Sequence, residues 1–333
     1  MKKIYLISND KVWFSNKKFT SNNDLDNIIT CLNGEYDVNL VCRKSDKKLY
    51  FPLNEKTGFC ELKNIQERNI NILLVSITPF NFFALLYLLF FKRINLRGFV
   101  YLRSDGFLEY KYRYGLIGYY SYYIMFSIIK KYLQILSCSK NFTKVKVEYV
   151  LHPSELNSKW FKRDNIEKDM NIDFLYVGRF KKDKGSFYLV NIFKKYLKDY
   201  NLTIVGNEKN LIPEKYYSNN INYLSSISNI NDLIKVYDSS KIFILPSFIE
   251  GFPKVISESL ARLKPIIIFE EIEYVIDKRK GIFVSKRDEK SLRRTINYIY
   301  ENYTDIQRQI QENYFYTKDN FREEFLASIK NGF

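Results

Sequence analysis

The sequence contains 333 residues, of which 46% are hydrophobic and 17% aromatic. This length exceeds what one compact core usually organises, so two domains are expected, and the apolar content excludes a disordered protein. Lysine and arginine exceed the acidic residues by 53 to 37, a formal net charge of +16. That charge indicates an anionic partner such as nucleic acid, a membrane surface or a phosphorylated substrate. The alternative is a compositional bias that enriches Lys, Asn, Ile, Tyr and Phe together.

The cysteines and the apolar runs exclude further classes. The four cysteines are scattered without a Cys-x-x-Cys pair, which argues against a disulfide framework or a structural zinc site and favours a reducing cytosol. The N-terminal MKKIYLISND has too short an apolar run for a signal peptide and predicts a first strand. The longest apolar run, residues 79–91, is shorter than the about 20 residues of a membrane-spanning helix.

The first half of the chain alternates strand and helix patterns. Strands are predicted over residues 3–7, 38–42, 71–76, 98–103, 135–139 and 147–151, and the apolar stretch after Pro79 predicts a helix. This rhythm is typical of a mostly parallel, doubly wound sheet. The segment SNNDLDNIITCL predicts a capped helix start, so Asp24 and Asp26 are not interpreted as a metal-binding motif.

The second half repeats the pattern after a polar stretch, residues 152–171, that is the best linker candidate. Strands are predicted over residues 173–177, 202–205, 221–224, 241–245 and 265–269, and two or three amphipathic helices over 288–330. We therefore expect one α/β domain over 1–155, a second over 170–315 and a C-terminal helix, 316–333, packed back on the first domain. Two such α/β domains would face a cleft, with ligands beyond the carboxyl ends of the strands.

The segment 246–267, PSFIEGFPKVISESLARLKPII, follows one of these strands. Pro253 suits the first position of a helix that is predicted to run to about Leu263. The free N–H groups and positive dipole of that helix end would attract an anion or a hydroxyl-rich ligand. Glu250 precedes the helix and Glu258 lies inside it, and carboxylates suit sugars because each can accept two hydroxyl hydrogen bonds. Incidental glutamates on a solvated helix are the alternative.

A second motif, DFLYVGRFKKDKGSFYLV, spans residues 173–190. A strand ends at Val177, Gly178 makes a turn, and Lys184-Gly185 opens a helix. Arg179 and Lys184 would therefore place two cations beside a helix N-terminus, which is a suitable clamp for a diphosphate. In a lysine-rich chain, solvated surface charge is the alternative for Lys184.

Residues 173–269 resemble the C-terminal domain of the family 4 glycosyltransferases, which have the GT-B fold. The resemblance is carried by VGRF-x4-KG, the LTIVG strand, the run NDLIKVYDSSKIFILPS and the segment EGFPKVISESLARLKP. It covers roughly a hundred residues in the family's order. The N-terminal half resembles the family only in its strand rhythm. The implied fold class is α/β GT-B, with two Rossmann-like doubly wound domains facing a cleft. The resemblance also implies that the first domain, 1–155, binds the acceptor and that the second, 170–315, binds the nucleotide sugar.

The resemblance implies a role for each motif residue. Arg179 and Lys184 would bind the diphosphate of a nucleotide sugar, Glu250 would contact the transferred sugar, and Glu258 would hold the ribose. The backbone of Gly251, Phe252 and Pro253 would bind sugar and phosphate.

The resemblance also implies a mechanism. Such enzymes retain the anomeric configuration, use no metal and no cofactor, and let the leaving diphosphate help to deprotonate the acceptor. This chemistry needs positioning and charge stabilisation and no protein nucleophile.

The N-terminal half departs from the family pattern. Many members have a Gly-Gly loop after the first strand, but here SNDKVWFSNKKF follows Ile7 without a glycine. The single histidine, His152, is interpreted as structural. Asp105, in the SDG that follows a predicted strand, is the candidate to accept the acceptor's hydrogen bond or proton. An ordinary Asp-Gly turn is the alternative for Asp105.

Residues 107–135 combine dense tyrosine with lysine and arginine. Tyrosine and lysine favour the headgroup zone of an anionic bilayer, so a peripheral position on the inner, cytoplasmic face of the cell membrane is expected. The alternative is an aromatic-rich packed helix pair.

Together these features predict an enzyme that moves a sugar from a nucleotide-diphosphate sugar, UDP- rather than GDP-linked, to a glycan or lipid-linked acceptor. A bacterial surface polysaccharide such as O-antigen, capsule or lipopolysaccharide is the expected product. Two alternatives stay open: a basic nucleic-acid-binding protein, and a non-catalytic GT-B partner subunit. The first would leave the two charged motifs unexplained, so no nucleic-acid partner is expected.

Overall fold

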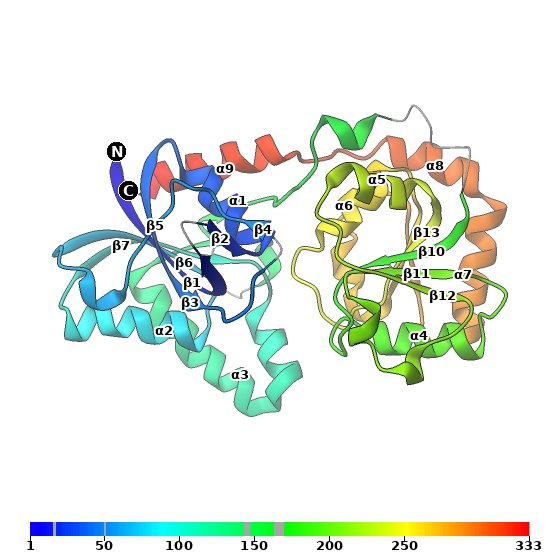
Figure 1. Cartoon of the computed structure of the whole chain (residues 1–333), viewed down its shortest axis with the longest axis horizontal. Helices are drawn as coiled ribbons and strands as arrows, with labels where there is room; N and C mark the ends of the chain where they lie inside the picture. Colours follow the sequence, from blue (N-terminus) through cyan, green and yellow to red (C-terminus); the bar gives the residue numbers. More distant parts are fainter. Residues whose placement is uncertain (16–17, 50, 143–146, 163–169, 333) are drawn as a thin grey trace. The chain divides into compact units, whose positions relative to one another are not determined.

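The computed structural model describes residues 1–15, 18–49, 51–142, 147–162 and 170–332. It divides into two compact units (Figure 1). The N-terminal domain comprises Met1–Pro153 together with Asp319–Phe333, and the C-terminal domain comprises Ser154–Lys318. Each domain is built around its own sheet.

The sheet of the N-terminal domain is parallel in its main body. Its central strand β1 pairs with β3 on one side and with β6 on the other, and β7, β8 and β9 follow β6. The strands are β1 (Lys2–Ser15), β2 (Lys18–Ser21), β3 (Tyr36–Lys44), β4 (Phe51–Pro52), β5 (Gly58–Phe59), β6 (Asn69–Val75), β7 (Asn95–Leu102), β8 (Gln134–Ser137) and β9 (Tyr149–Val150). The predicted strands of this half are thus confirmed, and the short β2, β4 and β5 were not predicted.

Strand β1 is much longer than the predicted residues 3–7. Its pairing with β3 shifts register between Ile7 and Lys11, after which the strand runs on and forms an antiparallel hairpin with β2. A strand that continues in this way needs no turn glycine. The hairpin is therefore the structural reason why no Gly-Gly loop follows Ile7.

Three helices of the N-terminal domain are α1 (Asn23–Leu32), α2 (Pro79–Leu86) and α3 (Gly106–Tyr132). Helix α2 continues directly into one π-helical turn, η2 (Tyr87–Phe91). The side chain of Asn22 caps α1, so the expected capped helix around Asp24 and Asp26 is confirmed. Helix α3 bends at Gly115, whose backbone (φ 65°, ψ −150°) lies in a region that is essentially restricted to glycine.

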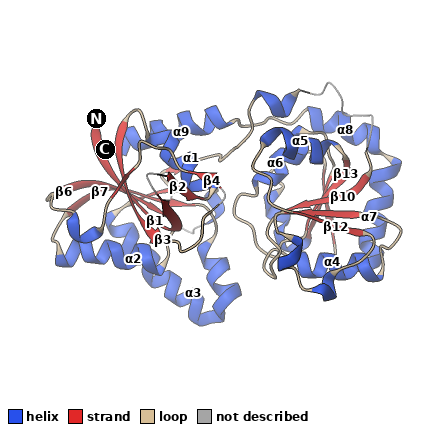
Figure 2. Cartoon of the chain, in the orientation of Figure 1, coloured by secondary structure: helices blue, strands red, loops and turns tan. Residues whose placement is uncertain are grey.

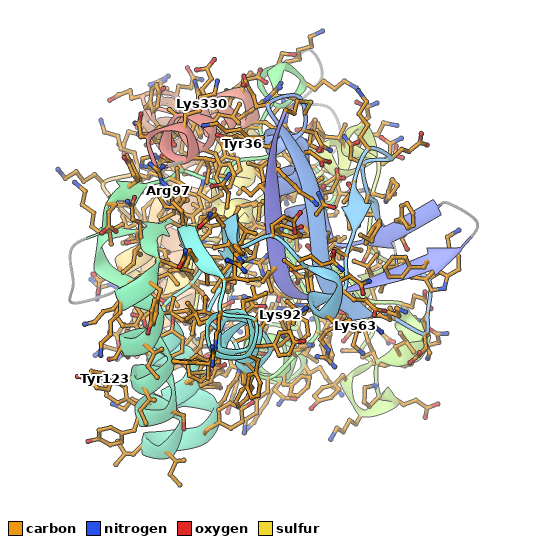
Figure 3. The ribbon with its side chains drawn as sticks, turned by 90° about the vertical axis from the view of Figure 1, so that its left-hand side faces the viewer. Tyr36, Lys63, Lys92, Arg97, Tyr123 and Lys330 are labelled. Carbon is orange, nitrogen blue, oxygen red and sulfur yellow. The ribbon has the colours of Figure 1, made fainter. Side chains whose placement is uncertain are left out.

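Helix α9 (Lys318–Gly332) completes the N-terminal domain from the far end of the sequence. The side chain of Arg97 donates to the carbonyl of Gly332 at 2.7 Å, and Lys330 pairs with Glu35 at 2.9 Å (Figure 3). His152 binds Glu324 of the same helix at 3.1 Å, which gives this histidine a structural role.

The sheet of the C-terminal domain has six parallel strands in the order β12-β11-β10-β13-β14-β15. They are β10 (Ile172–Val177), β11 (Leu202–Val205), β12 (Ile221–Leu224), β13 (Ser240–Leu245), β14 (Ile266–Phe269) and β15 (Ile282–Ser285). The helices α4 (Ser186–Lys195), α5 (Ile230–Asp238), α6 (Lys254–Ala261), α7 (Glu289–Glu301) and α8 (Tyr303–Gln311) surround the sheet (Figure 2). The predicted strands are confirmed, whereas the edge strand β15 was missed.

The stretch that the sequence suggested as a linker contributes to the C-terminal core. Leu156 and Trp160 are both 1% exposed, and the ring of Trp160 packs edge-on against Tyr237. The two domains do divide inside the predicted linker, between Pro153 and Ser154, but residues 156–160 pack into the C-terminal domain, because two large apolar side chains among them are buried. Residues 163–169 of the suggested linker lie outside the described residues.

We predict that Trp160→Ala lowers the free energy of unfolding by about 3–5 kcal/mol, because it empties a fully buried site. Urea unfolding measures this loss. Trp160→Phe keeps most of the packing volume and is the matched control, with a smaller expected loss. An alanine variant as stable as the parent would contradict the assignment of this segment to the core.

Candidate functional site

The two charged motifs meet where the strand order of the C-terminal sheet reverses. Helix α4 carries the chain from β10 outward to β11, and the chain later returns to place β13 against the other side of β10. In open α/β sheets, ligands bind beyond the carboxyl ends of the strands at such a switch point. Arg179 and Lys184 follow β10, and Glu250 follows β13, so all three lie at this edge.

Lys184 and Glu250 form an ion pair at this point. Their side-chain atoms lie 2.7 Å apart, and the side chains are 23% and 10% exposed. The hydroxyl of Ser247 donates to the same carboxylate oxygen at 2.5 Å. A carboxylate that is mostly buried needs such partners, since an unpaired charge would be costly there. The structure thus joins one cation and one acid from the two predicted motifs.

A glycine allows the two loops to approach each other. Gly185 caps α4 in a left-handed conformation (φ 67°), and a side chain there would place its Cβ 1.7 Å from the carbonyl oxygen of Pro246. The backbone N–H of Phe248 also donates to the carbonyl of Asp183 at 3.1 Å. Only glycine fits both this contact and this backbone angle.

Glu258 lies on α6 and is 8% exposed. It accepts a hydrogen bond from the hydroxyl of Tyr237 at 2.8 Å. Burial, and secondly the nearby Glu258, raise the pKa of Tyr237 well above its usual value, so the phenol keeps its proton and remains a donor. The hydrogen bond from Tyr237 thereby fixes the orientation of the Glu258 carboxylate and occupies one of its lone pairs.

The helix that follows Glu250 differs slightly from the prediction. Pro253 is the N-cap of α6 rather than its first residue, and the helix ends at Ala261 rather than near Leu263. Leu263 adopts a left-handed conformation (φ 57°) that cannot continue a helix. Arg262, at helical spacing from Glu258, makes a bidentate pair with Asp238 and is structural.

The remaining predicted donor residues lie around this core. Arg179 is exposed just after β10, and its carbonyl accepts a hydrogen bond from the hydroxyl of Tyr176 at 3.1 Å. Gly251 and Phe252 are partly exposed in the loop before α6. The structure therefore brings Lys184 and Glu250 into direct contact, while Arg179 stays on the surface near the strand end.

Two residues that the sequence reasoning missed hold the loop that carries Glu250. Arg287 donates to the carbonyls of Pro246 and Ser247 at 2.8 and 2.9 Å, and its guanidinium stacks on Phe248 at 3.9 Å. Arg287 follows β15, so only recognition of that edge strand could have indicated it.

Tyr274 is the second missed residue. Its hydroxyl accepts from the N–H of Glu250 at 3.1 Å and donates to the carbonyl of the same residue at 2.6 Å. The backbone of Glu250 is thus held by one side chain and its carboxylate by two others, and no sequence motif signalled this arrangement.

Asp105, the candidate in the N-terminal domain, caps helix α3. Its carboxylate accepts a hydrogen bond from the N–H of Leu108 at 3.0 Å, and burial raises its pKa above the ordinary value. This is the structural role of an N-cap aspartate. A part in catalysis remains a prediction.

Comparison with known proteins places these motifs in a family. Residues 158–315 match the model described as glycosyl transferases group 1, which spans nearly the whole C-terminal domain. The C-terminal domain is therefore similar to the group 1 glycosyl transferases. An uncharacterized glycosyltransferase of Haemophilus influenzae is 28% identical over 214 residues, which are 55% of this chain and 60% of that protein. CapM of Staphylococcus aureus, a capsular polysaccharide biosynthesis glycosyltransferase, is 32% identical over 142 residues, which are 39% of this chain and 37% of CapM.

Solved structures show the same fold as this chain. The structure of HepE of Anabaena in complex with UDP superposes with a TM-score of 0.68 at 12% identity, covering 99% of this chain and 100% of that one. WaaG, a glycosyltransferase involved in lipopolysaccharide biosynthesis, superposes with a TM-score of 0.67 at 11% identity over 98% and 100% of the two chains. The predicted GT-B architecture of two Rossmann-like domains is confirmed.

We predict that Gly185→Ala lowers the free energy of unfolding by about 1–3 kcal/mol more than Gly34→Ala does. Both glycines have positive φ, but only Gly185 faces a backbone oxygen at 1.7 Å, whereas a Cβ at Gly34 would meet no atom within 4 Å. Thermal unfolding of both variants separates the loss of stability caused by the close contact from the loss caused by backbone strain alone. Equal losses would show that the two loops are not tightly packed at Gly185.

Proposed function

We propose that this protein is a retaining glycosyltransferase that moves a sugar from a nucleotide-diphosphate sugar to a glycan or lipid-linked acceptor. The carrying observation is the Lys184–Glu250 ion pair, which brings a phosphate-binding type of residue and a sugar-binding type of residue to one switch point. Support for a role in bacterial surface polysaccharide synthesis comes from the names of its relatives, CapM among them.

The donor diphosphate would be bound by positive charge from several sources. Lys184 and Arg179 supply cations, and the N-terminus of α4 adds free N–H groups, since its N-cap Gly185 has no capping side chain. These groups can neutralise the leaving diphosphate in the way that a metal ion does elsewhere. We therefore propose metal-independent transfer without a cofactor.

The two glutamates would bind different parts of the donor. Glu250, oriented by Ser247, can accept hydrogen bonds from hydroxyls of the transferred sugar, next to the backbone of Gly251 to Pro253. Glu258 keeps oxygen lone pairs beyond its bond to Tyr237 and can accept from the ribose hydroxyls. A uridine donor is favoured over a guanosine donor because HepE, a structural neighbour, is known in complex with UDP.

The reaction would need no nucleophile from the protein. The diphosphate leaves on the face from which the acceptor attacks, and its oxygens take the acceptor's proton. The protein would contribute position and electrostatic stabilisation of the departing phosphate by Lys184 and Arg179.

We predict that Glu250→Ala abolishes transfer but leaves measurable nucleotide affinity, because Glu250 contacts the sugar. Lys184→Ala and Glu258→Ala should weaken UDP binding about tenfold or more, since each removes a charged hydrogen-bond partner. Titration calorimetry with UDP and GDP measures this difference.

Lys182→Ala and Glu214→Ala are matched controls, because both side chains are exposed. Equal loss of nucleotide affinity in the three site variants would contradict the assigned roles. A parent protein that binds neither UDP nor GDP would overturn the proposed function.

We further propose that the N-terminal domain attaches to an anionic membrane surface on the cytoplasmic side. In the described part of the chain, no helix combines the length and hydrophobicity that crossing a bilayer requires. Helix α3, however, exposes several large apolar side chains, and Tyr123 points outward from the helix (Figure 3). We call these exposed residues the α3 patch; they are Tyr112, Tyr114, Leu116, Ile117, Tyr120, Tyr123 and Ile124. Exposed aromatic and aliphatic side chains beside lysines are typical of surfaces that enter the headgroup zone.

We predict that the protein floats with phosphatidylglycerol vesicles at low salt and that Leu116→Ser with Ile117→Ser reduces the bound fraction several-fold. The matched control is Leu211→Ser in the C-terminal domain, because Leu211 is 66% exposed and Leu116 65%. Vesicle binding should fall as the salt concentration rises, because salt screens the attraction between the lysines and the anionic lipids. No flotation of the parent protein at low salt would remove the membrane proposal.

A further inference from the structure

A second group of polar residues lies at the carboxyl edge of the N-terminal sheet. Ser8 is the last residue of β1 that pairs with β6, Asp10 lies just after it, Ser76 follows β6, and Arg103 follows β7. The registers align these strand ends, because Ser8 pairs with Val75 and Val75 pairs with Tyr101.

This edge has the topology of a binding site. The chain leaves β1 through α1 to reach β3 on one side, and later places β6 on the other side of β1. The strand order therefore reverses at β1, which makes its carboxyl end a switch point. The side chains at this point are the ones that a ligand of the domain would meet first.

Among the described residues, the guanidinium of Arg103 makes only long contacts. It lies 3.3 Å from the hydroxyl of Ser76, 3.4 Å from a carboxylate oxygen of Asp10 and 3.9 Å from one of Asp24. Charge-assisted hydrogen bonds to arginine are usually about 2.7–2.9 Å long. The side chain is 27% exposed and that of Asp10 is 20% exposed. A partly buried arginine with stretched contacts can form shorter bonds to a ligand oxygen.

The backbone beneath this group is constrained. Ser76 has a left-handed conformation (φ 68°), which is unfavourable for a residue other than glycine. The side-chain amide of the buried Asn81 holds the carbonyls of Val75 and Ser76 at 2.7 and 2.8 Å. The position of the Ser76 hydroxyl against Arg103 is therefore fixed by a strained turn.

The balance of charge decides which ligand fits. Two carboxylates stand beside the one guanidinium, Asp10 at 3.4 Å and Asp24 at 3.9 Å, so acids outnumber bases among these three side chains. A phosphate or carboxylate would be repelled by both aspartates. A hydroxyl group can accept from Arg103 and donate to Asp10 at once, so a neutral polyhydroxylated ligand is favoured.

We propose that Arg103, Asp10 and Ser76 form a binding site for a neutral sugar unit of the acceptor. This inference rests on the proposed glycosyltransferase function and names the class of acceptor. It also assigns acceptor binding to residues other than Asp105, whose carboxylate caps α3.

The test is a ligand-observed NMR titration of the parent protein with neutral methyl glycosides of glucose, galactose and N-acetylglucosamine. Methyl glucuronide and glucose 6-phosphate serve as anionic counterparts. We expect at least one neutral glycoside to bind more tightly than both anions. Asp10→Asn and Arg103→Gln should each weaken that binding about tenfold, because each removes the charged partner of a hydroxyl.

Asp37→Asn is the matched control, because Asp37 is exposed near the start of β3, at the opposite edge of the sheet. Thermal unfolding checks that each variant is folded, and the isosteric Asp10→Asn is the variant to trust if Arg103→Gln unfolds.

UDP affinity, measured in parallel, separates this inference from the proposed function. If the parent protein binds UDP but no neutral glycoside, the acceptor site alone is overturned. The same holds if UDP binds and Asp10→Asn leaves the glycoside affinity unchanged. A preference for the anions also overturns it. Loss of UDP binding in the parent protein overturns both.

Discussion

The ion pair between Lys184 and Glu250 is the interaction on which the C-terminal site depends. The two residues are 66 positions apart in the sequence, and their 2.7 Å contact requires that β10 and β13 be neighbours and that Gly185 lie against Pro246. Ser247, Tyr274 and Arg287 then fix the loop from its other sides. The pair is stable in this mostly buried place because each charge offsets the cost of removing the other from water.

The sequence predicted the parallel strands well, because fully buried strands are continuous apolar runs. LTIV became β11 with unchanged bounds, and both this strand and Ile266–Phe269 are buried throughout. INYL also kept its bounds, although it forms the partly exposed edge strand β12. The sequence also indicated that Lys184 and Glu250 would lie close together, since their motifs follow strands directly, and the structure shows that contact. It could not predict Arg287 or Tyr274, because their contacts depend on packing between segments that are far apart. It missed the hairpin of β1 and β2 because a strand that runs past its sheet shows no turn signal.

The two domains carry different kinds of polar site within one fold. In the C-terminal domain, Arg179 and Lys184 precede the uncapped N-terminus of α4 in the sequence, and the proposed binding of a charged donor rests on this arrangement. In the N-terminal domain, Arg103 is flanked by two aspartates, and the proposed binding of a neutral partner rests on these contacts. A net charge of +16 therefore says little about an individual site, because the local arrangement of a few side chains determines its preference.

Helix α9 has a consequence for the order in which the chain can fold. The C-terminal domain is one continuous segment, Ser154–Lys318, whereas the N-terminal domain is completed by the last residues of the chain. During synthesis, the second domain is fully emerged before the first can receive α9 against Arg97 and Glu35. A premature stop after residue 318 would therefore damage the domain that was made first and leave the later one whole.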